Sequence, residues 1–552
     1  MGWSSQFIEQ LKRKSIVPKY RLIFQDIGSS NSNVIIIGSD RSSIIYQGVV
    51  IKSLTAPRIL KTNVKIQGTA VTPQSWNVSF GGWSLGIVGD IRYFSKHLTR
   101  GRFAKLECDI GTGYEIIAWG QLKTSRRDGP ITYLQFADAI SSLQSGVDAD
   151  TILTSASGHA QSQPSTIMRY AGFEDTITIN YNVVSDTELY VNSVSIYEKE
   201  TGQNGVVKLS NGADTYYLEW TGKGVNYLTV IPNVVVYPTV GSTIGNLTTA
   251  NGVVNPVALL NDFPGDILGK IIMSTGTGSN GSLDKYPAQW SIGANPGPGV
   301  FAFDHIDSNW QKRKILTLEN QDPSYKWKIP VEAEWTSGLR EFCNLSQKCG
   351  IWPVFRQGKI SIRGCVDPYG PSNYNNVVDP ISVVDSDIQR VVSHDLYNPQ
   401  NAGIYVVSNM YYGQALGAAK SNQNVSDIIP KAKSLPIQNS IDRDNALMYD
   451  GGVGATGLSL RKKHADADQY RMLGYDNYTH EKLTLDLDIR FSILCAGDLV
   501  SITSDILFGL CEGPGETYQN RIGMVIGTQF DIGRQQATVT ISILPTQNYR
   551  NS

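Results

Sequence analysis

The chain carries little charge, and what it carries is balanced. Charged residues make up 18% of its 552 residues, and the formal net charge is -1. A sequence-specific nucleic-acid binder normally presents a basic field to its polyanionic partner. The balance therefore argues against such a binder, and it leaves open a neutral polar surface along which DNA could slide.

Long apolar runs are also missing. No window reaches the ~18 apolar residues that a membrane span needs. Residues 1–20 contain a weakly amphipathic run and a basic cluster, but they lack the apolar core of a signal peptide. The sequence therefore predicts no membrane span and a protein that is made and assembled in a cytoplasm.

Cysteine and histidine are scarce, with six of each. No spacing indicates a disulfide framework or a zinc-type CxxC pair, so Cys343, Cys349 and Cys365 are interpreted as free thiols. No HxH or HxxxH spacing occurs, and there is neither a GxSxG nor a Walker-type loop. We expect no metal site, no cofactor and no catalytic residue.

Acidic residues could still form a hydrolase site. Paired catalytic carboxyl groups stand about 5 Å or about 6.5–9.5 Å apart in glycosidases, which a sequence cannot reveal. Pairs of this kind also arise by chance among 49 acidic residues, so we interpret them as solvated turn carboxylates. The candidates are Asp304 beside His305, Asp385 with Asp387, and Glu512 with Glu516.

What the chain does have is strand-like alternation, clearest near its C-terminus. Residues 483–491 alternate apolar and polar positions, so one face of the predicted strand is buried and the other wet. Further short strands are predicted at 499–503, 522–526 and 537–543. Strands joined by turns, without helices between them, predict an antiparallel sheet or small barrel.

The N-terminal part, from about residue 20 to residue 144, has the same character. β-Branched runs bounded by Gly and Ser are followed by three strands, with a hairpin at residues 126–130. Strand lengths and turn styles match those of the C-terminal part. We expect the two units to be an internal pair that superpose on one another.

Between these units, residues 166–240 predict a small β-sandwich. The flanking segments, 145–166 and 241–252, are polar and linker-like, as expected of an inserted domain. Strands are predicted at 176–179, 189–191, 194–197, 217–220 and 227–231. Four aromatic residues of this segment could stack on a sugar or contact a partner, although alternating aromatics in a sandwich are more often core: Tyr216, Tyr217, Trp220 and Tyr227.

The middle of the chain is predicted to be α+β. Helices are expected at 257–260, 266–273 and 338–348, and a hairpin around Gln357 and Gly358. Residues 414–478 are predicted to form a long irregular segment that contains a helix at 461–474. The predicted fold is mainly β, with these domains: a tube-like β-barrel at 1–144, linkers and inserted sandwich at 145–254, the α+β domain at 255–387, and a second tube-like barrel at 388–552.

The order of these parts resembles the baseplate or tail-tip hub proteins of long-tailed bacteriophages. The first likeness runs through residues 255–260, 274–278 and 290–293, where a short helix is expected before a "GTG…W" stretch. The second is the helix and hairpin at 336–363. The third is residues 496–502, similar to a "PGD-V" turn with Ala496 in place of the frequent Pro.

This resemblance implies a structural protein of the virion, assembled in the host bacterium's cytoplasm. Hub proteins carry two tube-type barrels per chain, so a homotrimer makes a ring of six barrels that caps the tail tube. Its lumen would pass DNA and hold the end of the tape-measure protein. Other implied partners are distal tail or tube proteins and tail fibre or tip proteins, with the inserted sandwich as a docking or carbohydrate-contacting module.

Two alternatives belong to other classes. A tail-associated glycan-binding or glycan-hydrolysing protein would carry a paired-carboxylate cleft and an aromatic-lined groove. A cell-surface adhesion protein would carry a signal peptide and repeated sandwiches, and the sequence shows neither.

Overall fold

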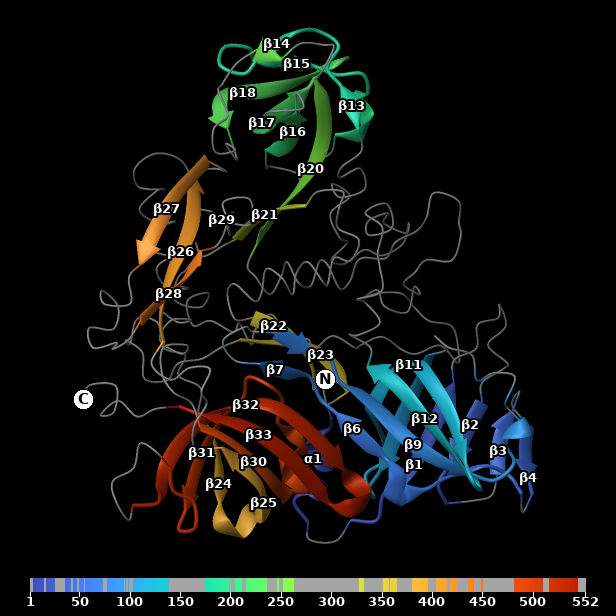
Figure 1. The fold of residues 1–552 in the computed structure, drawn as a ribbon. Coiled ribbons are helices and arrows are strands. Elements are labelled where there is room, and N and C mark those ends of the chain that lie inside the picture. Colours follow the sequence, from blue (N-terminus) through green and yellow to red (C-terminus); the bar gives the residue numbers. More distant parts are fainter. Residues whose placement is uncertain are drawn as a thin grey trace.

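The computed structural model confirms a mainly β, multidomain chain (Figure 1). One α-helix, α1 (Ser5–Leu11), lies in the part of the chain that the structure describes. The described residues are 3–13, 16–24, 35–40, 43–46, 49–53, 55–72, 77–93, 95, 98, 103–138, 174–197, 199, 204–210, 215–235, 246–247, 252–262, 327–331, 351–356, 358–364, 380–395, 404–414, 417–423, 435–440, 448–449, 481–509 and 516–544.

Two β-units lie side by side in the lower half of Figure 1. The N-terminal β-unit contains β1 (Lys19–Phe24), β2 (Ile35–Gly38), β3 (Ser43–Tyr46), β4 (Val49–Lys52), β5 (Arg58–Ile59), η1 (Lys61–Asn63), β6 (Lys65–Gln67), β7 (Ala70–Thr72), β8 (Asn77–Ser79), β9 (Gly82–Val88), η2 (Ile91–Tyr93), β10 (Phe103–Asp109), β11 (Tyr114–Asp128) and β12 (Ile131–Asp138). The C-terminal β-unit contains β24 (Ile381–Val384), η8 (Asp385–Asp387), β25 (Ile388–Asp395), β30 (Glu481–Asp488), η10 (Ile489–Ile493), β31 (Leu499–Ser504), β32 (Tyr518–Asp531), η11 (Ile532–Arg534) and β33 (Gln536–Ile543).

The C-terminal β-unit curls back on itself. Its strands are hydrogen-bonded in the order β25-β30-β33-β32-β31-β24. The two end strands, β24 and β25, are joined by the three residues of η8. So short a connection brings the two ends of the strand path together, which is the geometry of a small barrel.

The N-terminal β-unit repeats this strand order. Its path is β6-β9-β12-β11-β10-β1, and when only the six strands on each path are numbered in chain order, both paths read 2-3-6-5-4-1. A 3₁₀ turn follows the strand that is third in chain order among these six, η2 after β9 and η10 after β30. The two units differ in the direction of one strand, because β1 is antiparallel to β10 whereas β24 is parallel to β31.

Alternation of buried side chains explains the strands of the C-terminal unit. Leu483, Leu485 and Leu487 are fully buried in β30, and β33 buries every second residue opposite them. The predicted strand at 483–491 is confirmed as far as Asp488. There the side chain of Asp488 accepts the amide N–H of Arg490 and turns the chain into η10.

The segment that was predicted to be an inserted sandwich, called the sandwich below, stands apart from this pair in Figure 1. Its elements are β13 (Asp175–Thr176), β14 (Tyr181–Asn182), β15 (Glu188–Tyr190), η6 (Val194–Ile196), β16 (Gly205–Ser210), β17 (Thr215–Lys223), β18 (Tyr227–Val235), β19 (Asn246–Leu247) and β20 (Val253–Asp262). Between the sandwich and the two β-units are β21 (Trp327–Val331), β22 (Ile351–Arg356), β23 (Lys359–Gly364), β26 (Ile404–Gln414), β27 (Gly417–Gln423), β28 (Leu435–Ser440) and β29 (Met448–Tyr449).

The helix expected at residues 257–260 is wrong, because these residues belong to strand β20. The first half of β20 pairs with β16 and the second half with β21. Backbone pairing with β16 along the first half of the strand and with β21 along the second half outweighs the high helix propensity of Ala258, Leu259 and Leu260. The strand therefore runs across the predicted domain boundary at residue 254.

The strand expected at residues 194–197 is also wrong. Residues 194–196 form the 3₁₀ turn η6, and the carboxylate of Asp175 holds its two ends. Asp175 Oδ2 accepts the amide N–H of Ser193 at 3.0 Å and the hydroxyl of Tyr197 at 3.1 Å. A carboxylate that is distant along the chain thus draws the backbone out of the sheet.

Some of the other expectations are confirmed, and some lie outside the described residues. The hairpins at residues 126–130 and around Gln357 and Gly358 are confirmed. Strands β27, β28 and β29 lie within residues 414–478. The helices expected at 266–273, 338–348 and 461–474 lie outside the described residues.

Candidate assembly interface

The two β-units are joined by main-chain pairing into one 16-stranded sheet. Strand β32 pairs along one edge first with β31 and then, at its far end, with β6. Gln529 and Phe530 face Gln67 and Ile66 in register, and the amide of Gly68 donates to the carbonyl of Thr528 at 2.8 Å. The junction is therefore a continuous sheet rather than a contact between separate surfaces.

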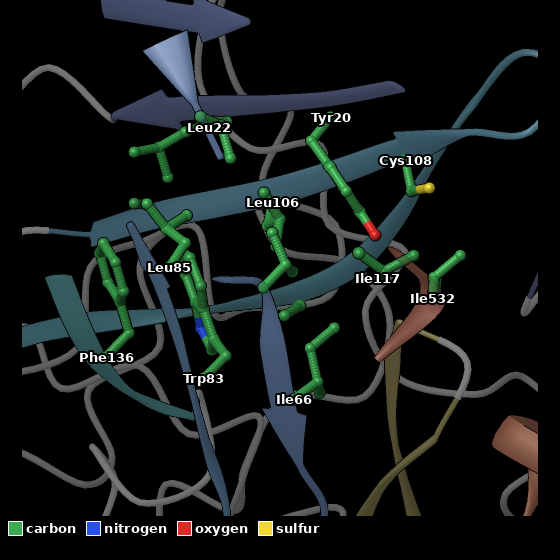
Figure 2. Close-up of a cluster of buried hydrophobic side chains, with 14 of the residues drawn as sticks. Tyr20, Leu22, Ile66, Trp83, Leu85, Leu106, Cys108, Ile117, Phe136 and Ile532 are labelled. Atoms are coloured by element: carbon green, nitrogen blue, oxygen red, sulfur yellow. The ribbon is translucent and has the colours of Figure 1, made fainter. Parts of the chain in front are cut away.

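The apolar core crosses the same junction. Ile489 and Ile532 of the C-terminal unit belong to the core cluster of the N-terminal unit. Figure 2 shows Ile532 beside Ile117, near Cys108 and the hydroxyl end of Tyr20. Because the cluster draws residues from both units, separating them would expose core side chains to water.

The N-terminal segment is packed into this joint. The indole N–H of Trp3 donates to the carbonyl of Ile116 at 2.8 Å, and its ring meets that of Phe530 edge-on at 6.2 Å. The side-chain amide of Gln535 donates to the carbonyl of Ile16 at 3.2 Å. The first residues of the chain thereby fasten both units.

The hairpin of β22 and β23 makes a second bridge between the units. At its turn, the carbonyl of Gly358 accepts the indole N–H of Trp119, on β11, at 3.3 Å. Phe355 meets the ring of Trp119 edge-on at 5.9 Å. On the other side, the indole N–H of Trp352 donates to the carbonyl of Ala496 in the C-terminal unit at 3.2 Å.

The turn at residues 496–498 has a structural role for each of its residues. Ala496 offers its carbonyl to Trp352. Gly497 is in the left-handed region (φ +97°), and a Cβ there would lie 2.8 Å from Cβ of Arg363. Asp498 accepts the Arg363 Nε–H at 3.0 Å. Only glycine combines this φ with so close an approach.

Asp498→Ala is expected to destabilise this bridge. The other carboxylate oxygen accepts the amide N–H of Cys495 at 2.9 Å, so the change removes a turn contact and an ion pair whose Arg363 side chain is only 12% exposed. We expect a loss of about 2 kcal/mol or more in the free energy of unfolding, measured by urea titration. Asp395→Ala, at an exposed position, is the control; equal losses in both variants would contradict this role.

A groove of about 210 Å³ lies along the junction. Arg390, Arg534 and Lys65 line it together with two largely buried carboxylates, Asp486 and Asp531. Asp486 is satisfied by Arg390 Nε at 2.8 Å and by a hydroxyl at 2.6 Å. Burial raises the pKa of Asp531, although Arg534 and Lys65 oppose the shift.

Asp531→Asn is expected to stabilise the protein near neutral pH. A carboxyl group whose folded pKa is raised costs folding free energy once it is ionised, so the cost grows as the pH rises through the ordinary value towards the raised one. The variant should unfold at a higher temperature than the parent above that window, and the difference should vanish in acid. Thermal melts of both proteins at several pH values test this, with Asp505→Asn as an exposed control. A difference independent of pH would contradict it.

The sheet ends at strand β4 on the side away from the C-terminal unit (Figure 1). Among the described strands β4 pairs only with β3, so no described strand covers its outer edge, which is called the open edge below. Val49 and Val50 on this strand are 63% and 53% exposed. An open edge with apolar side chains is a template for pairing with another chain.

The aromatic residues predicted to touch a glycan or partner do not form one cluster. Trp220 is 1% exposed in the sandwich core, with Lys199 and Lys223 over its ring. Tyr227 is half-buried and lies beside Tyr190. Tyr216 and Tyr217 lie on β17, and their side chains are outside the described residues.

The acidic candidates that the structure describes have structural contacts. Asp387 is buried, forms an ion pair with Arg490 and accepts the amide of Val384. Asp385 accepts the amide of Asp505 at 2.9 Å. Glu516 is exposed. The remaining candidates, Asp304, His305 and Glu512, lie outside the described residues.

The cysteine and histidine residues discussed next have structural positions in the described part of the chain. Cys108 and Cys495 are buried free thiols, whereas Cys343, Cys349 and Cys365 lie outside the described residues. His394 contacts the buried carboxylate of Glu481 and the hydroxyl of Tyr518. Within the described ranges, no group of three His, Cys, Asp or Glu side chains could hold a metal ion. Among the described residues, no helix is long and apolar enough to cross a bilayer.

Sequence reasoning missed the two tryptophans of the bridge. Trp119 and Trp352 each sit inside a strand pattern, where an aromatic residue is unremarkable. Their partners are 239 and 144 residues away along the chain. The sequence contains one sign of this bridge, the turn at residues 496–498. Its Gly497 and Asp498 both lie against Arg363 of the hairpin.

Comparisons with known proteins give low-identity likenesses. No protein-family model matches the chain, and no curated protein matches it. Three solved structures align over nearly all of both chains. They are the 43 kDa tail protein of prophage MuSo2 from Shewanella oneidensis (8% identity, TM-score 0.35, 96% of this chain and 99% of that one), the tail protein from Neisseria meningitidis MC58 (9%, 0.35, 95% and 96%), and prophage tail protein gp18 from Listeria monocytogenes EGD-e (8%, 0.36, 94% and 94%). At such low identities and TM-scores the likeness assigns neither family nor function.

Proposed function

We propose that this protein is a structural hub of a bacteriophage tail tip or baseplate. The supporting observation is the pair of β-units that share one strand order and are joined edge to edge through β32 and β6. A chain with two equivalent units side by side provides two of the six positions around a sixfold tube. Three chains then complete a ring of pseudo-sixfold symmetry.

The open edge of β4 closes this ring. It lies at the end of the sheet opposite the C-terminal unit, so each chain presents it towards the C-terminal unit of the next. Contacts between unlike surfaces form a closed ring when the rotation between copies is a simple fraction of a turn, here one third. Closure covers the exposed valines of β4 and leaves no edge for further growth.

The ring surrounds a channel for the tape-measure protein and for DNA during ejection. A chain with a net charge of -1 and few charged residues holds a polyanion weakly, which suits passage rather than binding. Distal tail or tube proteins pack above and below the ring, and fibre or tip proteins are anchored at its rim. In this role the protein is non-enzymatic and part of the virion, assembled in the bacterial cytoplasm.

Native mass spectrometry of the purified full chain tests the assembly. We expect a species of three chains whose share grows with protein concentration, because each contact is a single edge and associates by mass action. A protein that stays monomeric when mixed with its tail-tube neighbours, or one that forms six-chain rings, would contradict the proposal.

A further inference from the structure

The sandwich carries an aromatic pair on its outer surface, at the edge of its sheet. Strand β15 is the end strand of that sheet and pairs with β18, with Tyr190 opposite Tyr227 and Glu188 opposite Thr229. The intervening Leu189 and Leu228 are fully buried in the core. Since side chains alternate along a strand, the two tyrosines, Glu188 and Thr229 share the outward face.

The pair is held in a defined geometry. The ring centroids of Tyr190 and Tyr227 are 5.3 Å apart, with the planes inclined by 47°. Gly224 lies against the ring of Tyr227, where a Cβ would come within 2.3 Å of it, and the amide of Gly224 donates to the carbonyl of Tyr227 at 2.8 Å. The backbone thus sets the position of this ring.

A carboxylate completes the cluster. The hydroxyl of Tyr190 donates to Glu188 Oε2 at 2.6 Å, and this hydrogen bond raises the pKa of Tyr190. The tyrosine therefore remains a protonated donor at neutral pH. Glu188 is exposed, and in the described part of the chain no cation forms an ion pair with it.

We propose that Glu188, Tyr190, Tyr227 and Thr229 form a binding site for a neutral saccharide. A pyranose ring has apolar C–H faces that pack on tyrosine rings, and hydroxyl groups that donate to a carboxylate. The negative charge of Glu188 repels acidic sugars, so the site favours a neutral saccharide over an acidic one. The outward face of the sheet suits a chain of sugars lying across the surface.

This assignment differs from a purely structural role for the pair. The sandwich already buries its own large aromatic residues, with Trp220, Tyr181 and Tyr197 in the core. Tyr190 and Tyr227 keep exposed ring surface beyond that core, so the core does not need them to be aromatic. The site is independent of the proposed ring, because it lies on the inserted sandwich and away from β4 and the β-unit junction (Figure 1).

A glycan array with the labelled full-length protein tests the site, using immobilised neutral and acidic bacterial saccharides. We expect binding to neutral saccharides that falls at least about tenfold in Tyr190→Ala and in Tyr227→Ala. Glu188→Gln keeps the shape of the side chain and should weaken binding as well. Val225→Ala, at a 97% exposed neighbouring position, is the control and should bind as the parent does.

Thermal melts of each variant separate loss of the site from loss of the fold. If a tyrosine variant unfolds, Glu188→Gln, which keeps the packing, decides the question by its binding. The proposal is overturned if the parent protein binds no neutral saccharide, if it prefers acidic saccharides, or if folded variants of the cluster bind as tightly as the parent. Trimer formation is measured separately, so failure here leaves the ring proposal standing.

Discussion

Leu487→Asp is expected to abolish folding of the C-terminal β-unit. Leu487 is fully buried in β30, in a cluster with Leu485, Val539 and Ile541. A carboxylate there would have no partner, and an unpaired buried charge costs several kcal/mol, a large share of the roughly 5–15 kcal/mol that stabilises a domain. We expect the variant to be insoluble or to lack the cooperative unfolding transition of the parent.

The neighbouring Asp486 shows what a buried carboxylate on this strand requires. Its oxygens accept hydrogen bonds from Arg390 and Thr538, and position 487 offers neither. Lys482→Asp is the matched control, because Lys482 is exposed on the same strand. Circular dichroism and urea titration compare the two. A Leu487→Asp protein with parental stability would mean that this strand does not form the core described above.

Damage to the C-terminal unit should spread to the N-terminal unit. The core cluster of the N-terminal unit includes Ile489 and Ile532, and the sheet is continuous through β32 and β6. Protection of backbone amides in β9 and β12 against hydrogen exchange should therefore fall in Leu487→Asp. Unchanged protection there would show that the two units fold separately.

Charging the open edge is expected to prevent assembly without harming the fold. In Val49→Lys with Val50→Lys, two exposed apolar side chains of β4 become cations, and lysine is a common means of blocking edge-to-edge pairing. If β4 joins the next chain, the concentration needed for trimers should rise by about tenfold or more. The monomer should melt as the parent monomer does.

Val225→Lys provides the control, since Val225 is 97% exposed and lies between β17 and β18 of the sandwich, away from β4 in Figure 1. Sedimentation velocity of the three proteins over a concentration series gives the populations. Equal association of the edge variant and the control would exclude β4 as the closing surface.

Local pattern predicted the strands because burial in them alternates residue by residue. Strands β31, β32 and β33 each contain an expected segment, and β30 matches the expected segment at 483–491 as far as Asp488. The pattern was misleading where distant partners decide the outcome. Residues 257–260 become strand because β16 and β21 pair with them, and residues 194–196 turn because Asp175 binds the backbone.

The interface could be predicted only in outline. Matched strand lengths indicated two similar units, and the repeated strand order agrees with that, although superposition of the two units stays a prediction. Their junction through Phe530 and Ile66, and the hairpin that binds Trp119, depend on contacts between residues hundreds of positions apart. No local pattern encodes those contacts. Of the aromatic pair on the sandwich, Tyr227 was singled out, whereas Tyr190 and Glu188 joined it only through strand register.

A reconstruction of the assembled tail tip by electron cryomicroscopy tests the central claim most directly. The proposal predicts three copies of this chain around one axis, with six β-units forming the ring and β4 of each copy against the C-terminal unit of the next. Within each chain, β32 and β6 should remain paired as they are here. A single copy on the axis, six copies in one ring, or three copies whose β-units do not line a common channel would contradict it.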